Sequence, residues 1–314
     1  MYLLFPDHPL SVYRALAIEQ CLLNHPEITE PVLFGWIGEP AVVMGKNQNP
    51  WRECNLGVIR ELNLKLARRV SGGGAVYHDE GNLNLSWILP RENYSPQRMY
   101  DLLLDALFRL GIPAEVGKGG VFRVEEKKIG GSAFCYRKEK VLHHGTLLMN
   151  ADLSRLKASL SPPRLRMRTH AVTSLPAAVL NLNSRFPELT SLRVLEVLQQ
   201  VTSMHFGAAC PLPVNALPED QLRKEEVHQA SHEWMWGQTP RFHTTLDLPG
   251  SSMADLTIYK GHVTEVLLNG EVIPGADPVL FTLDHLGELD DILGLEPGGV
   301  TAALQQEGWA FLSK

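Results

Sequence analysis

Three short stretches of the chain combine glycines with cationic or imidazole side chains. The first runs Arg68-Arg69-Val70-Ser71-Gly72-Gly73-Gly74-Ala75-Val76-Tyr77-His78-Asp79 and continues with Gly81-Asn82-Leu83-Asn84. Successive glycines remove the side chains from a turn, so that backbone N–H groups can converge on an anion. Arg69 carries a guanidinium that can hold a phosphate by two hydrogen bonds. Alone, such a turn is more often only geometry, and it has neither the Gly-Lys-Ser/Thr of a P-loop nor the helix of a dinucleotide-binding turn.

The second stretch is Lys128-Ile129-Gly130-Gly131-Ser132-Ala133, and the third is His143-His144-Gly145-Thr146-Leu147-Leu148. Each has an ordinary interpretation when it is taken alone. Lys128 would be a solvated lysine on an edge strand, and the two histidines would divide between core and surface, because neighbours in a strand face opposite ways. Only the combination of the three stretches indicates chemistry.

The bulk composition excludes several classes of protein. The chain has 314 residues, of which 44% are hydrophobic, and its net charge of −6 argues against a nucleic-acid partner. Its four cysteines, Cys21, Cys54, Cys135 and Cys210, include no Cys-x-x-Cys pair, which is typical of a reducing compartment. No apolar stretch approaches the ~18–20 residues of a membrane span, and the first residues lack a basic leader region. We therefore expect a cytoplasmic enzyme without a membrane partner.

The elements that must position these stretches begin with a helix over residues 11–24, which Ser11 can cap and which places Glu19 among apolar residues. Residues 32–37 and 41–45 resemble a hairpin across Gly38-Glu39-Pro40. Further strands are predicted at 66–70, 75–78 and 82–89. In the last of these, Leu83, Leu85 and Trp87 face one way, and Asn82, Asn84 and Ser86 face the other.

The remaining pattern predicts a helix over 96–110, strands near 121–125, 131–136 and 141–149, and a helix over 191–205. Strands joined by short turns favour an α+β fold with a mixed, mainly antiparallel sheet and flanking helices. Residues 1–206 would form the main domain, and the proline-rich and charged residues 207–241 a connector. Residues 242–314 would form a small α/β accessory domain, with strands near 243–248, 253–259 and 262–268 and helices near 285–293 and 299–306.

Together the three stretches resemble the lipoate–protein ligase A family, whose motifs occur here in the same order. Gly45-Lys46-Asn47-Gln48-Asn49-Pro50-Trp51 is similar to the family's Asn-Pro-Trp segment. The resemblance is strong over residues 10–175. The connector at Trp234–Pro240 and the turn at Lys260-Gly261-His262-Val263-Thr264 are similar to the accessory domain of the longer ligases. The resemblance implies a class II aminoacyl-tRNA synthetase/biotin ligase-like fold.

The activity that this resemblance implies is ATP-dependent activation of lipoate to lipoyl-AMP, followed by transfer of the lipoyl group to a lysine of a carrier protein. ATP and Mg²⁺ would be needed. Lipoic acid or octanoate would be the acyl substrate. The carriers would be apo lipoyl domains of 2-oxoacid dehydrogenases, the glycine-cleavage carrier protein or another carrier.

The resemblance also assigns roles to single residues. Lys128 would be the catalytic cation that lowers the repulsion between a carboxylate and the α-phosphate. The nucleotide-binding positions would be Arg69, Gly73, Gly74, Ala75, Val76, Tyr77 and Lys128. The lipoate-binding positions would be Glu19, Arg69, Ser71, His78, Lys128 and His144.

One segment departs from the family pattern. Ligases of this family commonly carry Gly-Arg-Asn-Asp before the lysine strand, where the aspartate helps with magnesium and phosphate, whereas this chain has Gly117-Lys118-Gly119-Gly120. Lys118 can replace the arginine, but the aspartate is absent. Asp79, Glu125 and Glu126 are the nearby acidic residues that could substitute, and the sequence does not choose among them.

Two other functions compete with the ligase. An ATP-independent transferase that moves octanoyl or lipoyl groups between carriers would need a nucleophile such as a cysteine thiolate, and Cys135 is two residues beyond Ala133. A non-catalytic relative that binds lipoyl carriers or an adenylate would explain the missing aspartate. The retained Lys128 argues against that second alternative.

Overall fold

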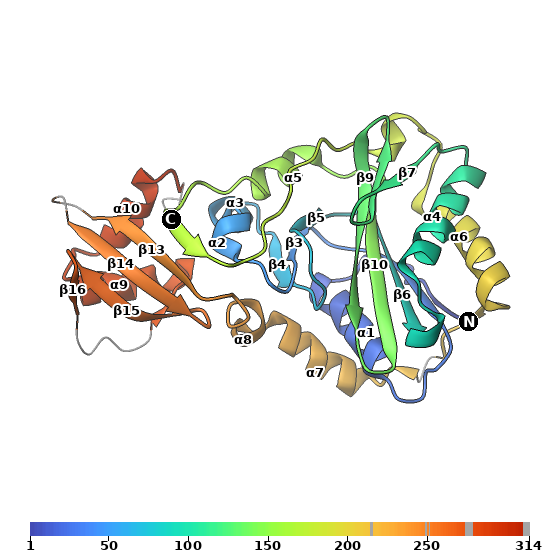
Figure 1. Cartoon of the computed structure of the whole chain (residues 1–314), viewed down its shortest axis with the longest axis horizontal. Coiled ribbons are helices and arrows are strands. Elements are labelled where there is room, and N and C mark those ends of the chain that lie inside the picture. Colours follow the sequence, from blue (N-terminus) through green and yellow to red (C-terminus); the bar gives the residue numbers. More distant parts are fainter. Residues whose placement is uncertain (214–215, 249, 251, 274–278, 310–314) are drawn as a thin grey trace.

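The structure is a computed structural model that describes residues 1–213, 216–248, 250, 252–273 and 279–309. Three sheets are described, with helices packed on them (Figure 1). No described helix has the length and apolar character to cross a membrane. The predicted α+β class with mainly antiparallel pairing is confirmed, since the large sheet contains only two parallel pairs, β1 with β12 and β1 with β2.

The large sheet has the strand order β12-β1-β2-β6-β10-β9-β8-β7. Its strands are β1 (Tyr2–Leu4), β2 (Val32–Ile37), β6 (Asn82–Pro90), β7 (Glu115–Gly117), β8 (Val121–Val124), β9 (Lys127–Tyr136), β10 (Lys140–Leu148) and β12 (Cys210–Pro211). The second sheet has the order β4-β3-β5, formed by β3 (Ala41–Met44), β4 (Lys65–Arg68) and β5 (Val76–His78). The glycine turn of the first stretch therefore joins two strands that flank β3.

The helices α4 (Pro96–Arg109) and α6 (Ser191–Phe206) cover one face of the large sheet, while α1 (Val12–Asn24) covers the other (Figure 1). On β6, Leu83, Leu85 and Trp87 join the core under α4 and α6, as predicted. Helix α1 also packs on the small sheet through Val12 and Leu16. It therefore lies between the two sheets, where its Glu19 is buried.

Short helices surround this body. They are α2 (Pro50–Glu53), α3 (Leu56–Glu61), α5 (Leu153–Ser159) and the 3₁₀ turns Arg91–Asn93 and Leu182–Ser184. The connector contains α7 (Glu219–Ala230), which packs on α1, and α8 (His232–Met235), which contacts β4.

The C-terminal sheet has the order β11-β13-β14-β15-β16, with β17 also on β15. Its strands are β11 (Met167–Thr169), β13 (Phe242–Asp247), β14 (Met253–Tyr259), β15 (His262–Leu268), β16 (Glu271–Val272) and β17 (Val279–Leu280). The 3₁₀ turn Leu283–His285 and the helices α9 (Leu286–Leu293) and α10 (Gly299–Gln306) complete it. The division at residues 206 and 241 stays a proposal, because β11 pairs with β13 and β12 pairs with β1 across it.

Two local predictions are wrong. Residues 32–37 and 41–45 do not form a hairpin, because β2 pairs with β1 and β6 whereas β3 pairs with β4 and β5. The chain at Gly38 is held instead by Leu10, which exchanges backbone hydrogen bonds with Ile37 and Glu39. Ser11 occupies the N-cap of α1 but makes no side-chain capping bond.

Candidate active site

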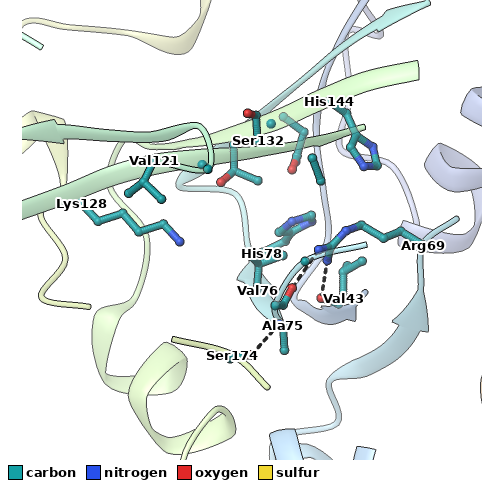
Figure 2. A pocket seen from close by; sticks show the side chains of 18 of the residues that line it. Val43, Arg69, Ala75, Val76, His78, Val121, Lys128, Ser132, His144 and Ser174 are labelled. Atoms are coloured by element: carbon teal, nitrogen blue, oxygen red, sulfur yellow. Dashed lines mark hydrogen bonds between the residues drawn. The ribbon is translucent and has the colours of Figure 1, made fainter. Parts of the chain in front are cut away.

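A cavity of about 340 Å³ lies where α1, the small sheet and the large sheet meet (Figure 2). The glycine turn and β5 form one wall, and β6, β9 and β10 form the opposite wall. Nine predicted site residues line it: Glu19, Arg69, Gly73, Gly74, Ala75, Val76, His78, Lys128 and His144. The structure thus brings all three stretches of the sequence to one cavity.

Lys128 enters the cavity from β9. Its side chain extends toward Val76 and His78 on the opposite wall (Figure 2), and its amine passes over Gly131, where an added Cβ would lie 3.4 Å from Nζ. Burial lowers the pKa of Lys128, and the positive charges of Arg69 and Arg123 lower it further. The amine therefore faces the glycine turn as an incompletely solvated cation, which favours binding of an anion between them.

The guanidinium of Arg69, which lines the cavity, holds the glycine turn itself. Nη2 donates to the carbonyl oxygens of Gly72 (2.6 Å) and Gly74 (2.8 Å), Nη1 donates to Val43 O (3.2 Å), and Nε donates to Ser71 Oγ (3.0 Å). Four of its five N–H groups are therefore occupied. The remaining N–H and the positive charge still face the cavity, but a bidentate phosphate clamp is not available in this arrangement.

The three glycines of the turn differ in whether they could be replaced by a residue with a side chain. Gly73 has φ +93°, and a Cβ there would lie 2.9 Å from Arg69 Nη2. A Cβ on Gly74 would lie 2.9 Å from Ser174 Oγ, the atom that accepts a hydrogen bond from Ala75 N. Gly72 has no neighbour within 4 Å of its Cβ position. The backbone of the turn is thus fixed at Gly73 and Gly74, while Gly72 has room for a side chain.

A chain of buried hydrogen bonds connects Arg69 to Glu19. Ser71 Oγ lies 2.6 Å from His144 Nε2, and His144 Nδ1 lies 3.0 Å from both oxygens of Glu19. Since Arg69 can only donate and a carboxylate can only accept, Ser71 donates to Nε2 and His144 donates from Nδ1. Ser86, which is paired with His144 across β6 and β10, donates to Glu19 (2.5 Å). Ser71 stands behind the cavity wall and orients His144, whereas Glu19 and His144 line the cavity.

His78 and Trp36 present unpartnered polar atoms in this cavity. Neither ring nitrogen of His78 nor Nε1 of Trp36 has a hydrogen-bond partner among the described residues, and the two rings meet edge to face at 5.6 Å. Burial lowers the pKa of His78 to about 3, with smaller contributions from the charges of Arg69 and His144. A neutral, buried imidazole without a partner is costly in the free protein.

Besides Ser71, four predicted positions do not contribute side chains to the cavity. Tyr77 points into the opposite core, so only its backbone lies near the turn. The carboxylate of Asp79 accepts hydrogen bonds from the backbone N–H groups of Gly81 (2.9 Å) and Asp152 (2.8 Å), and Glu125 pairs with Arg185. Glu126 is exposed on a tight turn. Among the described residues no group of three His, Cys, Asp or Glu side chains could hold a metal ion.

Several lining residues were not predicted from the sequence: Leu16, Trp36, Asn84, Ser86, Thr146, Val172, Thr173, Ser174 and Leu175. The alternation of β6 carried a signal for two of them, because Asn84 and Ser86 are polar and yet buried. The segment 172–175 closes the cavity through Ser174, which bonds to Gln48 and Ala75. Lys118 and Gly119, from the segment that departs from the family pattern, also line the cavity.

Cys135 does not belong to this site. It is buried in the core beside Leu142 and Ile88, it lies 3.0 Å from Arg137 Nη1, and it does not line the cavity. No other cysteine lines the cavity within the described part of the chain. The thiolate nucleophile that a transferase mechanism requires is therefore missing from the lining.

The structure therefore combines an α+β body, built on a mainly antiparallel sheet, with a cavity lined by a lysine and a glycine turn. The family model for the lipoyl protein ligase A/B catalytic domain matches residues 11–203. The chain therefore belongs to the lipoyl protein ligase A/B catalytic-domain family, and the predicted family is confirmed.

Solved structures support the same fold. The P. falciparum LipL1 structure in complex with lipoate is 21% identical, covers 99% of both chains and gives a TM-score of 0.68. The putative lipoate protein ligase Ta0514 from T. acidophilum is 24% identical over 74% of this chain and 98% of its own, with a TM-score of 0.62. A lipoate-protein ligase A bound with ATP is 25% identical over 74% of this chain and 97% of its own, with a TM-score of 0.62.

Proposed function

We propose that the protein activates lipoate with ATP to form lipoyl-AMP and then transfers the lipoyl group to a lysine of an apo carrier protein. The observation that carries this proposal is that the Lys128 amine and the Gly73–Gly74 turn face one another across a single cavity. The relatives support it further, because one was solved with lipoate and another with ATP.

The first step joins two reactants of the same charge. An oxygen of the lipoate carboxylate attacks the α-phosphorus of ATP, the bond to the bridging oxygen breaks, and pyrophosphate leaves with its electron pair. We assign Lys128 the position between the two anions, because its side chain crosses the cavity toward the wall formed by the glycine turn. A cation there lowers their repulsion and stabilises the charge that develops. The backbone of the turn approaches the phosphates because Gly73 and Gly74 carry no side chain.

The second step is aminolysis of a mixed anhydride. The amine of the carrier lysine attacks the acyl carbonyl, AMP leaves, and the amide loses a proton, so the enzyme need not supply a nucleophile. Water would consume the anhydride, and the walls formed by α1, Trp36 and the segment 172–175 restrict its access. The apolar Leu16 and Trp36 fit an acyl chain, and His78 and His144 offer polar contacts within the same cavity.

Mg²⁺ is the expected companion of ATP, and the described residues offer it no group of three acidic or imidazole side chains. Metal bound to the phosphates themselves would need no such cluster. We assign no step to it. The carriers remain the lipoyl domains of 2-oxoacid dehydrogenases, the glycine-cleavage carrier protein or another carrier, which a mass-shift assay against apo forms would identify.

A pair of lysine variants tests the proposal. Lys128→Ala should reduce lipoate-dependent ATP–pyrophosphate exchange by about 10²–10³-fold, the cost of removing one positioned donor from a transition state. Lys127→Ala is the matched control, because Lys127 is its exposed neighbour on the same strand. Circular dichroism would establish that both variants fold. Exchange by Lys128→Ala at the level of Lys127→Ala would refute the assigned role.

An ATP-independent transferase is less well supported, because no cysteine lines the cavity within the described residues. Transfer of an octanoyl group between carriers without ATP, at a rate equal to that with ATP, would overturn the proposed ligase activity.

A further inference from the structure

A second concave region lies between the body and the C-terminal sheet. It is a groove of about 920 Å³ formed by α2, the segment 162–170 and β13. We call it the basic groove, after the six exposed basic residues that line it: Arg52, Arg164, Arg168, His170, Arg241 and His243. No aspartate or glutamate is part of its described lining, although the whole chain has a net charge of −6.

The arginines of the basic groove have few partners of their own. Arg52, Arg164 and Arg168 make no side-chain hydrogen bond or ion pair with the described residues, and Arg241 only stacks over the ring of Tyr259 at 4.8 Å. By contrast, the neighbouring Arg166 pairs with Asp247 on the adjoining surface. Four exposed guanidinium groups without a carboxylate create a local positive potential that attracts an anionic partner.

The basic groove and the catalytic cavity are lined by neighbouring parts of one segment of the chain. We call Val172–Leu175 the mouth of the cavity, because these lining residues include two exposed side chains. The part that lines the basic groove ends at His170, and the next residues, Val172 to Leu175, line the catalytic cavity. Two apolar side chains of this short connection are exposed, Val172 by 43% and Leu175 by 90%. An exposed apolar pair beside a charged rim is a typical arrangement of a protein-docking surface.

We propose that the basic groove and the Val172–Leu175 mouth form the docking surface for the carrier protein, and that the carrier presents an acidic face beside its target lysine. This inference rests on the proposed function, which requires a carrier at that mouth. The cations are spread over three elements and are exposed, whereas a small anion would be held by converging, buried donors. A macromolecular surface of opposite charge therefore fits them better.

The test uses the double variant Arg164→Glu/Arg168→Glu and the control Arg98→Glu/Arg109→Glu. The control changes the same charge on exposed arginines of α4, on the far side of the large sheet (Figure 1). The probe is an apo lipoyl domain with acidic residues around its target lysine. We expect the Kd and KM for this domain to rise about tenfold in the groove variant, with a weaker salt dependence than wild type. The control should stay within twofold.

Two further measurements separate this inference from the proposed function. Lipoate-dependent ATP–pyrophosphate exchange needs no carrier and should be unchanged in the groove variant. The Kd for the apo lipoyl domain, measured by direct binding, tests docking even if the wild-type protein shows no ATP–pyrophosphate exchange. A carrier variant with two of its acidic residues changed to lysine should restore binding to the groove variant. Equal Kd values for both double variants would overturn the proposal. The proposal would also be overturned if the groove variant bound the carrier as tightly as the wild type and lost affinity only for an RNA oligonucleotide or for inorganic phosphate.

Discussion

Two alanine variants in the glycine turn distinguish the effect of the backbone conformation at Gly73 from the effect of adding a methyl group anywhere in the turn. Gly73→Ala places a Cβ at φ +93°, where an L-residue costs about 1–2 kcal/mol. The same Cβ lies 2.9 Å from Arg69 Nη2, which bonds to the carbonyl oxygens on both sides of it. Displacing this guanidinium would weaken at least one hydrogen bond, at about 0.5–1.5 kcal/mol. The sum is about 1.5–3.5 kcal/mol.

The measurement that detects this free-energy cost depends on whether the cost falls on ATP binding or on folding. If the bound state alone carries this free energy, the KM for ATP in the exchange assay rises by about 10–300-fold, since 1.4 kcal/mol is a factor of about ten. Any share lost from folding appears as a lower Tm. Gly72→Ala is the control, because it has no neighbour within 4 Å and no positive φ, and it should stay within twofold. Equal KM and Tm values for the two variants would refute the assigned geometry of the turn.

Two further predictions concern protonation and the cysteine. Burial lowers the pKa of His78 and of His143 to about 3, so the unfolded chain binds more protons between about pH 3 and 6.5, and stability is lost as pH falls through that window. Each of these histidines should lower the free energy of unfolding, measured with urea, by about 2 kcal/mol at pH 5 relative to pH 7.5. A His143→Gln variant whose free energy of unfolding depends on pH as steeply as that of the wild type would contradict this. Cys135→Ala should keep ligase activity within twofold in the mass-shift assay, and its loss in a folded variant would revive the thiolate transferase.

The sequence predicts elements well where a local pattern is strong. The helix over 96–110 has Ser95 as its cap and a complete apolar stripe, and it is observed as α4. The alternation in β6 is also observed, since it follows from strand geometry alone. The hairpin at Gly38 failed for the opposite reason. A turn signal says that the chain reverses but not which strand it then joins, and here Leu10, far back in the chain, holds that point.

The sequence predicted which kinds of side chain form the site, but not which residues each of them contacts. The spacing of His143 and His144 predicted one buried and one exposed ring, yet both are buried. His143 lies among Trp87, Tyr94 and Tyr100 on one face, whereas His144 meets Glu19 on the other. Both faces of β10 are covered, which depends on the packing of α1 and α4 and is not encoded in a two-residue pattern.

Arg68 and Arg69 show how two adjacent cations can serve different parts of the molecule. Consecutive strand residues face opposite ways, so Arg69 holds the glycine turn while Arg68 is buried on the other side. There it donates to the carbonyl oxygens of Lys46 (2.9 Å) and Gln48 (2.8 Å), to Met235 O (2.6 Å) and to Thr239 Oγ1 (2.9 Å). The end of the connector is thus bonded to the loop beside the catalytic cavity. Arg68 therefore connects the end of the connector to the chain just before α2, whose Trp51 and Arg52 line the basic groove.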